Sequence, residues 1–325
     1  MREDLLNDLE KEYEAQRVSN EHEETLRREK IRRDFPEIDR VVSEREALVF
    51  QTLRQILDGS ANAERLPERM RNLNKSISVM LKEAGLPENY LSPVYRCEKC
   101  RDTGYTGETI KKPCDCLVRS YQRKLRDKIG LGQDKTETFE NYDESFIPDT
   151  PIEGINITQR SLTAIARKKC EEWADKFPEV AQRDILLTGS SGLGKTFLLR
   201  SMASRLIERG QNVLVMSSFA FLQIARKSYF ESDNGIQELL EVPVLMLDDL
   251  GSEPLMQNIT IEQLFNLINI RQTMKLSTVI STNLTLDELK DRYTERIASR
   301  LNNPDKCMIL TLAGRDLRKI ERHRK

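Results

Sequence analysis

The sequence predicts an α/β fold in which helices cover both faces of a five-stranded parallel β-sheet. In residues 151–325 short apolar runs alternate with helical stretches, which is typical of such a sheet. A glycine-rich loop separates the first apolar run from an apolar helix. Upstream, the composition changes at about residues 90, 125 and 150. We therefore expect a helical N-terminal region at 1–90, a small cysteine module at 91–125, a linker at 126–150 and the α/β domain at 151–325.

The N-terminal region is rich in Glu, Arg, Leu and Gln. Leu5 and Leu9 follow a four-residue spacing typical of one helix face. Pro36, Gly59 and Pro67 interrupt the pattern, which predicts three helices or a helical hairpin with an extension. Two roles are open for it, a solvated spacer and a docking module for a protein partner.

Residues 91–125 contain four of the six cysteines in the pattern C-x2-C-x13-C-x-C. Four thiolates on two short turns suit tetrahedral zinc in a structural site, because no coordination position stays open. An iron–sulfur cluster and unpaired reduced cysteines are the alternatives. Lysines, arginines and tyrosines lie between the cysteines, and such a surface either contacts phosphates and single-stranded bases or is merely solvated. The predicted zinc ligands are Cys97, Cys100, Cys114 and Cys116.

The five expected strands are continuous apolar runs, so we expect them to be buried on both faces. They are 184–188, 213–217, 244–248, 278–282 and 308–312.

The run ILLTGSSGLGKTFLL reads as a strand, a glycine-rich loop and a helix, and it fits the phosphate-binding pattern G-x-x-x-x-G-K-[ST]. Glycines let the backbone N–H groups point at phosphate oxygens, and the helix adds the positive end of its dipole. Lys195 is expected to reach the β- and γ-phosphates of ATP, and Thr196 to hold Mg²⁺. The predicted nucleotide-binding residues are Gly189, Ser190, Ser191, Gly192, Leu193, Gly194, Lys195 and Thr196.

Polar side chains follow two later strands. Asp248 and Asp249 end the third strand; placed beside the strand of the glycine loop, Asp248 would meet Mg²⁺ and Asp249 would polarise the attacking water. Asn283 ends the fourth strand, where it would position that water, unless it merely closes a turn. An acidic pair at this place favours hydrolysis over transfer to a substrate hydroxyl.

Arg292, Arg296 and Arg300 recur at every fourth residue, which predicts a row of guanidinium groups on one face of one helix. Such a row is either solvated or delivers an arginine finger to the nucleotide of a neighbouring subunit.

The bulk composition excludes several classes. The net charge is −1, so nucleic-acid binding requires a local patch. No apolar run approaches the roughly 20 residues that cross a bilayer. The acidic start MREDLLNDLEKEYE has no apolar segment typical of a signal peptide. We expect a cytoplasmic protein with reduced cysteines and no membrane partner.

These motifs, in this order, resemble those of AAA+ ATPases, and more closely those of bacterial and phage replicative-helicase loaders of the DnaC/DnaI type. The strings GSSGLGKTFLL, LMLDDLGSE, STNLTLDELKDRYTERIASRL and AGRDLR carry the resemblance, together with the cysteine segment. The resemblance implies that Asn283 is the sensor-1 residue, Arg300 the arginine finger with Arg296 as second choice, and Arg318 the sensor-2 arginine.

The resemblance also implies activity and partners. About a dozen residues follow the last strand, so we expect an AAA+ core without the usual helical lid. The pair Asp-Asp departs from the commoner Asp-Glu, which fits weak ATP hydrolysis. The segment RKSYF at 226–230 matches a region that contacts single-stranded DNA in the family, which points to Lys227, Tyr229 and Phe230; the alternative for Phe230 is core packing.

The leading hypothesis is therefore an ATP-switched loader that self-associates with ATP and delivers a replicative hexameric DNA helicase onto single-stranded DNA. An IstB-type transposition helper, which binds DNA and regulates a transposase, is the alternative. A small-molecule kinase or an adaptor with a structural glycine loop is a third class, disfavoured by the acidic pair and the arginines.

Overall fold

The computed structural model describes residues 2–57, 66–107, 109–131, 137–154, 156–231, 235–256 and 259–319. The chain forms two compact units. The first unit is Leu6–Leu117, and the second consists of Val118–Lys325 together with Met1–Leu5. The helical region and the cysteine module, predicted as separate parts, share the first unit. No helix among the described residues has the length and apolar character needed to cross a membrane.

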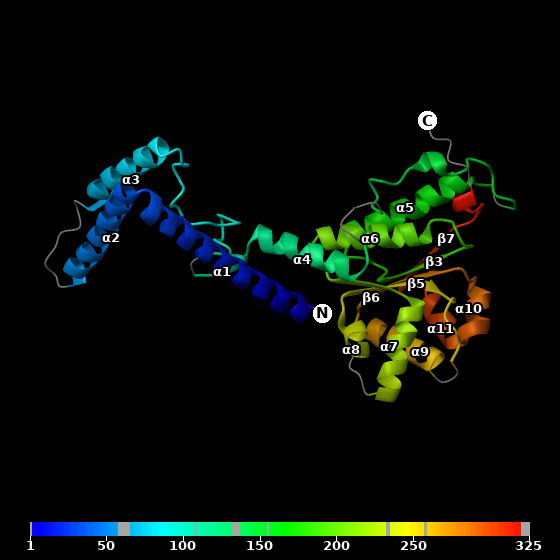
Figure 1. Ribbon diagram of the computed structural model, residues 1–325. Coiled ribbons are helices and arrows are strands. Elements are labelled where there is room, and N and C mark those ends of the chain that lie inside the picture. Colours follow the sequence, from blue (N-terminus) through cyan, green and yellow to red (C-terminus); the bar gives the residue numbers. More distant parts are fainter. Residues whose placement is uncertain are drawn as a thin grey trace. The chain divides into compact units, whose positions relative to one another are not determined.

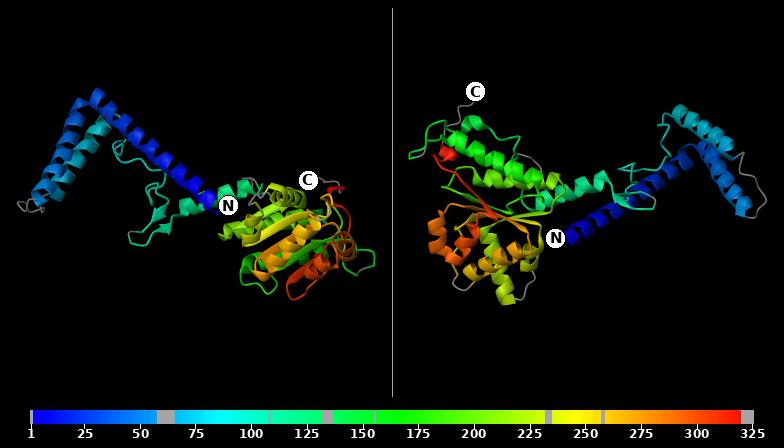
Figure 2. Two further views of the ribbon diagram at one scale, coloured as in Figure 1. Left: turned by 90° about the horizontal axis from the view of Figure 1, so that it is seen from below. Right: turned by 180° about the vertical axis from the view of Figure 1, so that it is seen from behind.

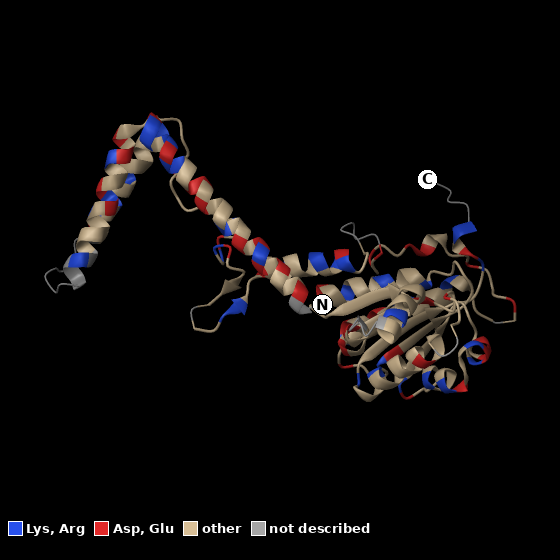
Figure 3. Cartoon of the chain, turned by 60° about the horizontal axis from the view of Figure 1, so that its bottom comes forward, with Lys and Arg blue, Asp and Glu red and all other residues tan. Residues whose placement is uncertain are grey.

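The first unit contains the three helices expected from the sequence (Figure 1). They are α1 (Arg2–Asp34), α2 (Pro36–Leu57) and α3 (Leu66–Glu83). Pro36 is the first residue of α2, where its missing N–H costs nothing. Gly59, expected between helices, lies outside the described residues. Acidic and basic residues are interspersed along these helices (Figure 3), and a small buried cluster that includes Ile31, Ile38 and Leu81 holds them together.

The second unit is built on a five-stranded parallel sheet in the order β4-β5-β6-β3-β7, which confirms the predicted fold class. Most of its strand residues are buried, as the apolar runs predicted. Strand β6 lies between β3 and β5, so the expectation that the acidic-pair strand neighbours the glycine-loop strand is wrong. The strands are β3 (Asp184–Thr188), β4 (Val213–Ser217), β5 (Val244–Leu250), β6 (Ser277–Thr282) and β7 (Cys307–Thr311).

Helices cover both faces of this sheet (Figures 1 and 2). One face carries α5 (Gln159–Lys176) and α6 (Lys195–Glu208). The other carries five helices, namely α7 (Ser218–Glu231), α8 (Gly235–Glu241), α9 (Thr260–Thr273), α10 (Leu286–Tyr293) and α11 (Glu295–Leu301). Buried aliphatic side chains from both helix layers and the strands form one continuous core.

Residues 126–150, expected as a linker, belong largely to this second unit. Helix α4 (Asp115–Lys128) continues past the expected module end, and its Gln122 donates to the carbonyl oxygen of Ile207 at 3.0 Å. Farther on, Phe139 and Ile147 are 1% and 3% exposed. The polar composition suggested irregular chain, but Phe139 packs in the core of the second unit and Ile147 is buried as well, which favours an ordered segment.

Candidate functional site

The glycine-rich loop joins β3 to α6, and its glycines meet specific steric demands. Gly189 has φ +139°, and a Cβ there would lie 2.1 Å from the carbonyl oxygen of Leu312. Gly192 has φ +79°, and a Cβ there would lie 1.8 Å from a carboxylate oxygen of Asp316. Any larger residue would therefore displace the loop. The loop leads directly into the N-terminus of α6, a place that favours anions.

Lys195 lies at the first turn of α6 and is only 6% exposed. Its Nζ donates to the carbonyl oxygens of Gly189 and Ser190 at 2.5 and 2.8 Å, and to Asn283 Oδ1 at 2.7 Å. Burial lowers the pKa of Lys195, and the charges of Asp249 and Asp248 oppose that shift. The ammonium group is thus poised beneath the loop, where phosphate oxygens would replace its present acceptors.

Replacing Lys195 by alanine is expected to weaken ATP binding by about 10- to 100-fold, since a hydrogen bond to a charged group is worth about 1.5–3 kcal/mol. Equilibrium titration with a fluorescent ATP analogue measures the change. Lys168→Ala, an exposed lysine of α5, is the matched control. An unchanged affinity in Lys195→Ala would exclude the loop as the phosphate site.

Asp248 lies at the carboxyl end of β5, beside the loop. Its Oδ1 accepts from Thr196 Oγ1 at 3.1 Å and from Ser281 Oγ at 2.5 Å. Ser281, on β6, was not singled out from the sequence. A hydroxyl and a carboxylate side by side are the oxygen ligands that Mg²⁺ prefers, so Thr196 and Asp248 fit the predicted ion.

Asp249 adopts a left-handed backbone conformation with φ +60°. Its N–H donates to Ser281 Oγ at 2.9 Å, and its Oδ1 accepts from Asn283 Nδ2 at 2.6 Å. This conformation departs from the extended backbone of the strand that carries Asp248. Asn283 donates to Asp249 and accepts from Lys195, so it links these two side chains. The predicted acidic pair and the predicted sensor asparagine therefore lie together.

Arg318 reaches the same loop from the short helix Leu317–Lys319. Its Nη2 donates to Ser191 Oγ at 2.9 Å and pairs with Asp316 Oδ2 at 2.9 Å. Hydrogen bonds from Arg318 hold the pKa of the Asp316 carboxyl down at about 2, so this carboxylate stays ionised at neutral pH. The sensor-2 candidate thus lies beside the phosphate loop.

These groups line a cavity of about 930 Å³, large enough for a nucleotide. Residues of the segment 141–147 also line this cavity, a role that their sequence did not predict. The Tyr142 ring packs near Phe197, with centroids 5.9 Å apart, and burial raises the pKa of its hydroxyl to about 12. That hydroxyl is buried and has no hydrogen-bond partner among the described residues. An aromatic ring in the lining of the cavity suits stacking on a nucleobase, although nothing in the sequence string ENYDESF marked it.

The arginine row expected on one helix is divided between two helices, so that expectation is wrong. Thr294, with φ +111°, ends α10 and precedes α11, which places Arg292 on one helix and Arg296 and Arg300 on the other. The guanidinium of Arg300 donates to Asn269 Oδ1 at 2.6 Å and lies 4.4 Å from the Phe265 ring centroid. The exposed guanidinium of Arg296 has no hydrogen-bond or ion-pair partner among the described residues.

The predicted DNA-contacting residues lie near the end of α7. Tyr229 and Phe230 are 54% and 65% exposed, and their rings meet edge to face at 5.1 Å. This exposure excludes the alternative in which Phe230 packs in the core. Lys227, on the same helix, is exposed as well.

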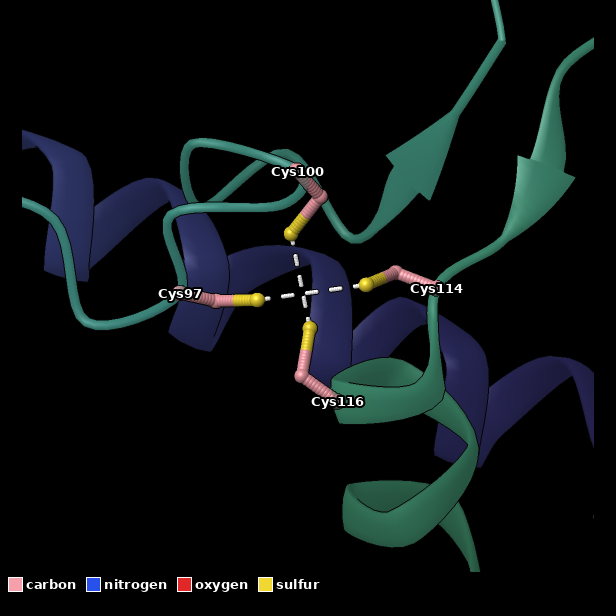
Figure 4. A group of neighbouring side chains, drawn as sticks. All are labelled: Cys97, Cys100, Cys114 and Cys116. Carbon is pink, nitrogen blue, oxygen red and sulfur yellow. Dashed lines mark hydrogen bonds between the residues drawn. The ribbon is translucent and has the colours of Figure 1, made fainter.

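The four predicted zinc ligands converge in the first unit (Figure 4). Their sulfur atoms all lie within 4.8 Å of one another; Cys97 and Cys114 are 3.9 Å apart, and Cys100 and Cys116 3.4 Å. Tetrahedral zinc with Zn–S bonds of about 2.3 Å requires S···S distances of about 3.8 Å. The donor set and its spacing therefore fit structural zinc, for which we retain this cluster as a candidate site.

Helix α1 supports this cluster from a distant part of the chain. Tyr13 Oη donates to Cys116 Sγ at 3.2 Å, and Asn20 Nδ2 donates to Asp102 Oδ2 at 2.7 Å. The buried Asp102 carboxylate also accepts the N–H groups of Arg96 and Cys97, both at 2.8 Å. The first turn of the module is thus fixed to α1 by a buried hydrogen-bond network, which would couple metal binding at this candidate site to the helical region.

We expect one zinc per chain and a loss of zinc affinity of about 10-fold in Tyr13→Phe, because partners of metal ligands typically contribute 10–100-fold. Competition with a chromophoric chelator measures the affinity, and elemental analysis gives the stoichiometry. Tyr105→Phe, in the same module, controls for loss of a tyrosine hydroxyl. Iron in place of zinc, or equal affinities for Tyr13→Phe and the control, would contradict this assignment.

Comparison with known proteins assigns the second unit to a family. The sequence model of the family described as "IstB-like ATP binding protein" matches residues 119–322. That range begins within α4 and includes the loop, the acidic pair, Asn283 and Arg318.

The individual relatives match shorter segments of the chain, at low sequence identity. The replicative helicase loader DnaI of Bacillus subtilis (strain 168) is 31% identical over 116 residues, covering 34% of this chain and 37% of that protein. The replicative helicase loader DnaC of Escherichia coli (strain K12) is 23% identical over 143 residues, covering 42% of this chain and 56% of that protein. The chain thus covers less than two thirds of either relative. A crystal structure of the DnaC helicase loader aligns with 54% of this chain and 98% of that one at 20% identity, with a TM-score of 0.43.

Proposed function

The chain belongs to the family of IstB-like ATP-binding proteins, and we propose that it is an ATP-switched loader that delivers a replicative hexameric DNA helicase onto single-stranded DNA. The observation that carries the switch is the convergence of Lys195, Asp248, Asp249, Asn283 and Arg318 on one cavity. The separate helical and cysteine-containing unit ahead of this core favours a loader, because it offers a second surface for a protein partner.

The proposed hydrolysis uses groups already in contact with one another. Mg²⁺, held by Thr196 and Asp248, would neutralise charge on the phosphates. Asp249 accepts a proton from the attacking water, and Asn283, bonded to Asp249, orients that water. The carboxylate of Asp249 is one methylene shorter than the more usual glutamate, which favours slow hydrolysis suited to a switch.

A further positive charge, which stabilises the negative charge of the transition state, comes from an arginine of a neighbouring subunit in the ATP-bound assembly. We assign Arg296 as the finger in preference to Arg300, which the sequence resemblance favoured. Arg300 is engaged within its own chain by Asn269 and Phe265, whereas the exposed Arg296 is available to a second subunit. In this assignment Arg300 orients α11 through its contacts with Asn269 and Phe265.

Single-stranded DNA binding is assigned to the end of α7. The exposed rings of Tyr229 and Phe230 offer stacking platforms, and base–aromatic stacking is worth about 1–3 kcal/mol per base. Lys227 adds a phosphate contact.

A transposition helper of the IstB type is the second candidate, favoured by the family match itself. Such a protein binds duplex DNA cooperatively and needs no helicase. This candidate function assigns no role to the helical and cysteine-containing first unit.

The test mixes the full-length protein with the replicative hexameric helicase of its host, with ATP or ADP, and measures complex mass by light scattering. We expect a defined complex that depends on the first unit. Phe50→Ser removes an aromatic side chain on α2 that is 73% exposed, and is expected to weaken the complex about 10-fold or more if Phe50 is an interface anchor. Ile165→Ser, 51% exposed on α5, is the matched control in the other unit.

No complex in either nucleotide state would contradict the loader assignment. Cooperative binding of duplex DNA in the same preparation would then favour the transposition helper. A complex that Ile165→Ser weakens and Phe50→Ser does not would move the docking surface to the second unit.

A further inference from the structure

Glu253 is a buried carboxylate close to the nucleotide site that the proposed hydrolysis does not use. It is 1% exposed and lies four residues beyond Asp249, in the loop after β5. Its Oε2 accepts the N–H of Gly251 at 2.9 Å, and its Oε1 accepts the hydroxyl of Tyr293. Because a buried carboxylate is costly unless paired, these bonds fix the side chain in one place.

The loop that carries Glu253 is fastened to the hydrolytic end of the site. The backbone oxygen of Asp249 accepts from Ser218 Oγ at 2.8 Å and from Ser252 Oγ at 2.9 Å. Gly251, with φ +107°, packs so closely on Leu284 that an added Cβ would lie 2.8 Å from it. A shift of this loop therefore disturbs the bonds that hold the Asp249 backbone and the packing of Gly251 on the Leu284 side chain.

On its other side Glu253 holds the end of α10. Tyr293, the last residue of that helix, is fully buried, and Arg292 donates through Nη2 to the backbone oxygen of Glu253. The guanidinium of Arg292 also lies 5.6 Å from the Tyr293 ring centroid. The helix break at Thr294 follows at once, and α11 with Arg296 begins one residue later. The position of Tyr293 thus sets where α11 starts.

We infer that Glu253 is a positioning residue whose hydrogen bond to Tyr293 couples the loop of Asp249 in one subunit to the α11 arginine offered to its neighbour. The inference rests on the proposed function, since it requires that Arg296 act in a second subunit. The pair continues a path that runs from Asp249 along the backbone to Gly251, through Glu253 to Tyr293 and on to the start of α11.

Tyr293→Phe removes the hydroxyl and keeps the buried ring. We expect unchanged ATP affinity, because the loop, Lys195 and Asp248 are untouched, and a fall in kcat of the assembled protein of about 10-fold or more, because a small misplacement of a catalytic group is costly. Glu253→Met, which keeps the side-chain length but offers no oxygen to the Tyr293 hydroxyl, is expected to give the same result. Tyr121→Phe removes another tyrosine hydroxyl, bonded to Asn212 at 2.6 Å, and is expected to leave kcat unchanged.

Subunit mixing separates a neighbour effect from local damage. The donor is Asp249→Asn, which is expected to bind ATP, to hydrolyse it at a rate far below that of the unaltered protein and to keep its own α11 intact. Tyr293→Phe is mixed with excess donor, so that its competent site faces an undisturbed Arg296 from the donor. Arg296→Ala mixed with the same donor reports whether the finger acts between subunits.

Recovery of hydrolysis in both mixtures supports the inference. Recovery for Arg296→Ala without recovery for Tyr293→Phe overturns it, since the pair then serves only its own loop. Recovery in neither mixture contradicts the proposed placement of the finger between subunits and removes the basis of the inference. Should Tyr293→Phe fail to fold, as judged by its thermal transition, Glu253→Met takes its place in the same mixtures.

Discussion

Replacing Arg296 by alanine is expected to reduce ATP hydrolysis by the assembled protein about 10³-fold or more, or to the background rate, since arginine fingers contribute about 10³–10⁵ to kcat. The expectation rests on the exposed, unpaired guanidinium of Arg296 at the start of α11. Hydrolysis is measured at protein concentrations above the assembly midpoint. ATP affinity of the single chain is expected to stay unchanged, because no bond within the chain's own cavity is lost.

Arg300→Ala is the matched control for Arg296→Ala. It removes the bonds to Asn269 and the contact with Phe265, so it should lower thermal stability and reduce kcat less than Arg296→Ala does. A larger kcat effect for Arg300→Ala, with stability unchanged, would restore the assignment that the sequence resemblance favoured. Arg296→Lys is expected to recover little, because a point charge does not reproduce the planar fork of guanidinium.

Replacing Asp249 by asparagine is expected to lower kcat by about 10²–10⁴-fold, the usual range for loss of a general base. The amide keeps the size of the side chain and an oxygen that can still accept from Asn283. ATP affinity should therefore change little. Single-turnover hydrolysis and equilibrium nucleotide binding, measured on the same preparation, separate the two effects.

Asp248→Asn provides the contrast to Asp249→Asn. Asp248 accepts from Thr196 and Ser281, so its loss is expected to weaken the dependence of ATP binding on Mg²⁺ as well as the rate. If Asp249→Asn weakened Mg²⁺-dependent binding and Asp248→Asn affected only kcat, the two roles would have to be exchanged.

Local sequence rules predicted the parts of the fold and site that local chemistry dictates. The glycine loop was recognisable because positive φ angles and close backbone approach require glycine, and the strands because burial on both faces requires continuous apolar runs. The acidic pair and Asn283 were recognisable as polar residues at strand ends, where parallel strands bring side chains to one edge.

The remainder depends on contacts between segments far apart in sequence. Tyr13 lies 103 residues before Cys116, and no spacing rule connects them. Tyr142 lies in a polar segment whose composition is typical of a linker. Phe139 and Ile147, on either side of it, are buried, and Tyr142 itself lines the cavity. The four-residue spacing of the arginines fits one uninterrupted helix, so it could not reveal the break at Thr294. The strand order, which inserts β6 between β3 and β5, is likewise a tertiary property.

The most direct test of the loader assignment measures how much hexameric helicase becomes stably bound to circular single-stranded DNA. The helicase of the host is incubated with DNA and ATP, with this protein, with its Lys195→Ala variant or with neither, and DNA-bound helicase is quantified after separation. We expect a large increase with the unaltered protein and none with Lys195→Ala. Equal amounts of bound helicase in all three reactions would contradict the assignment of this chain as an ATP-switched helicase loader.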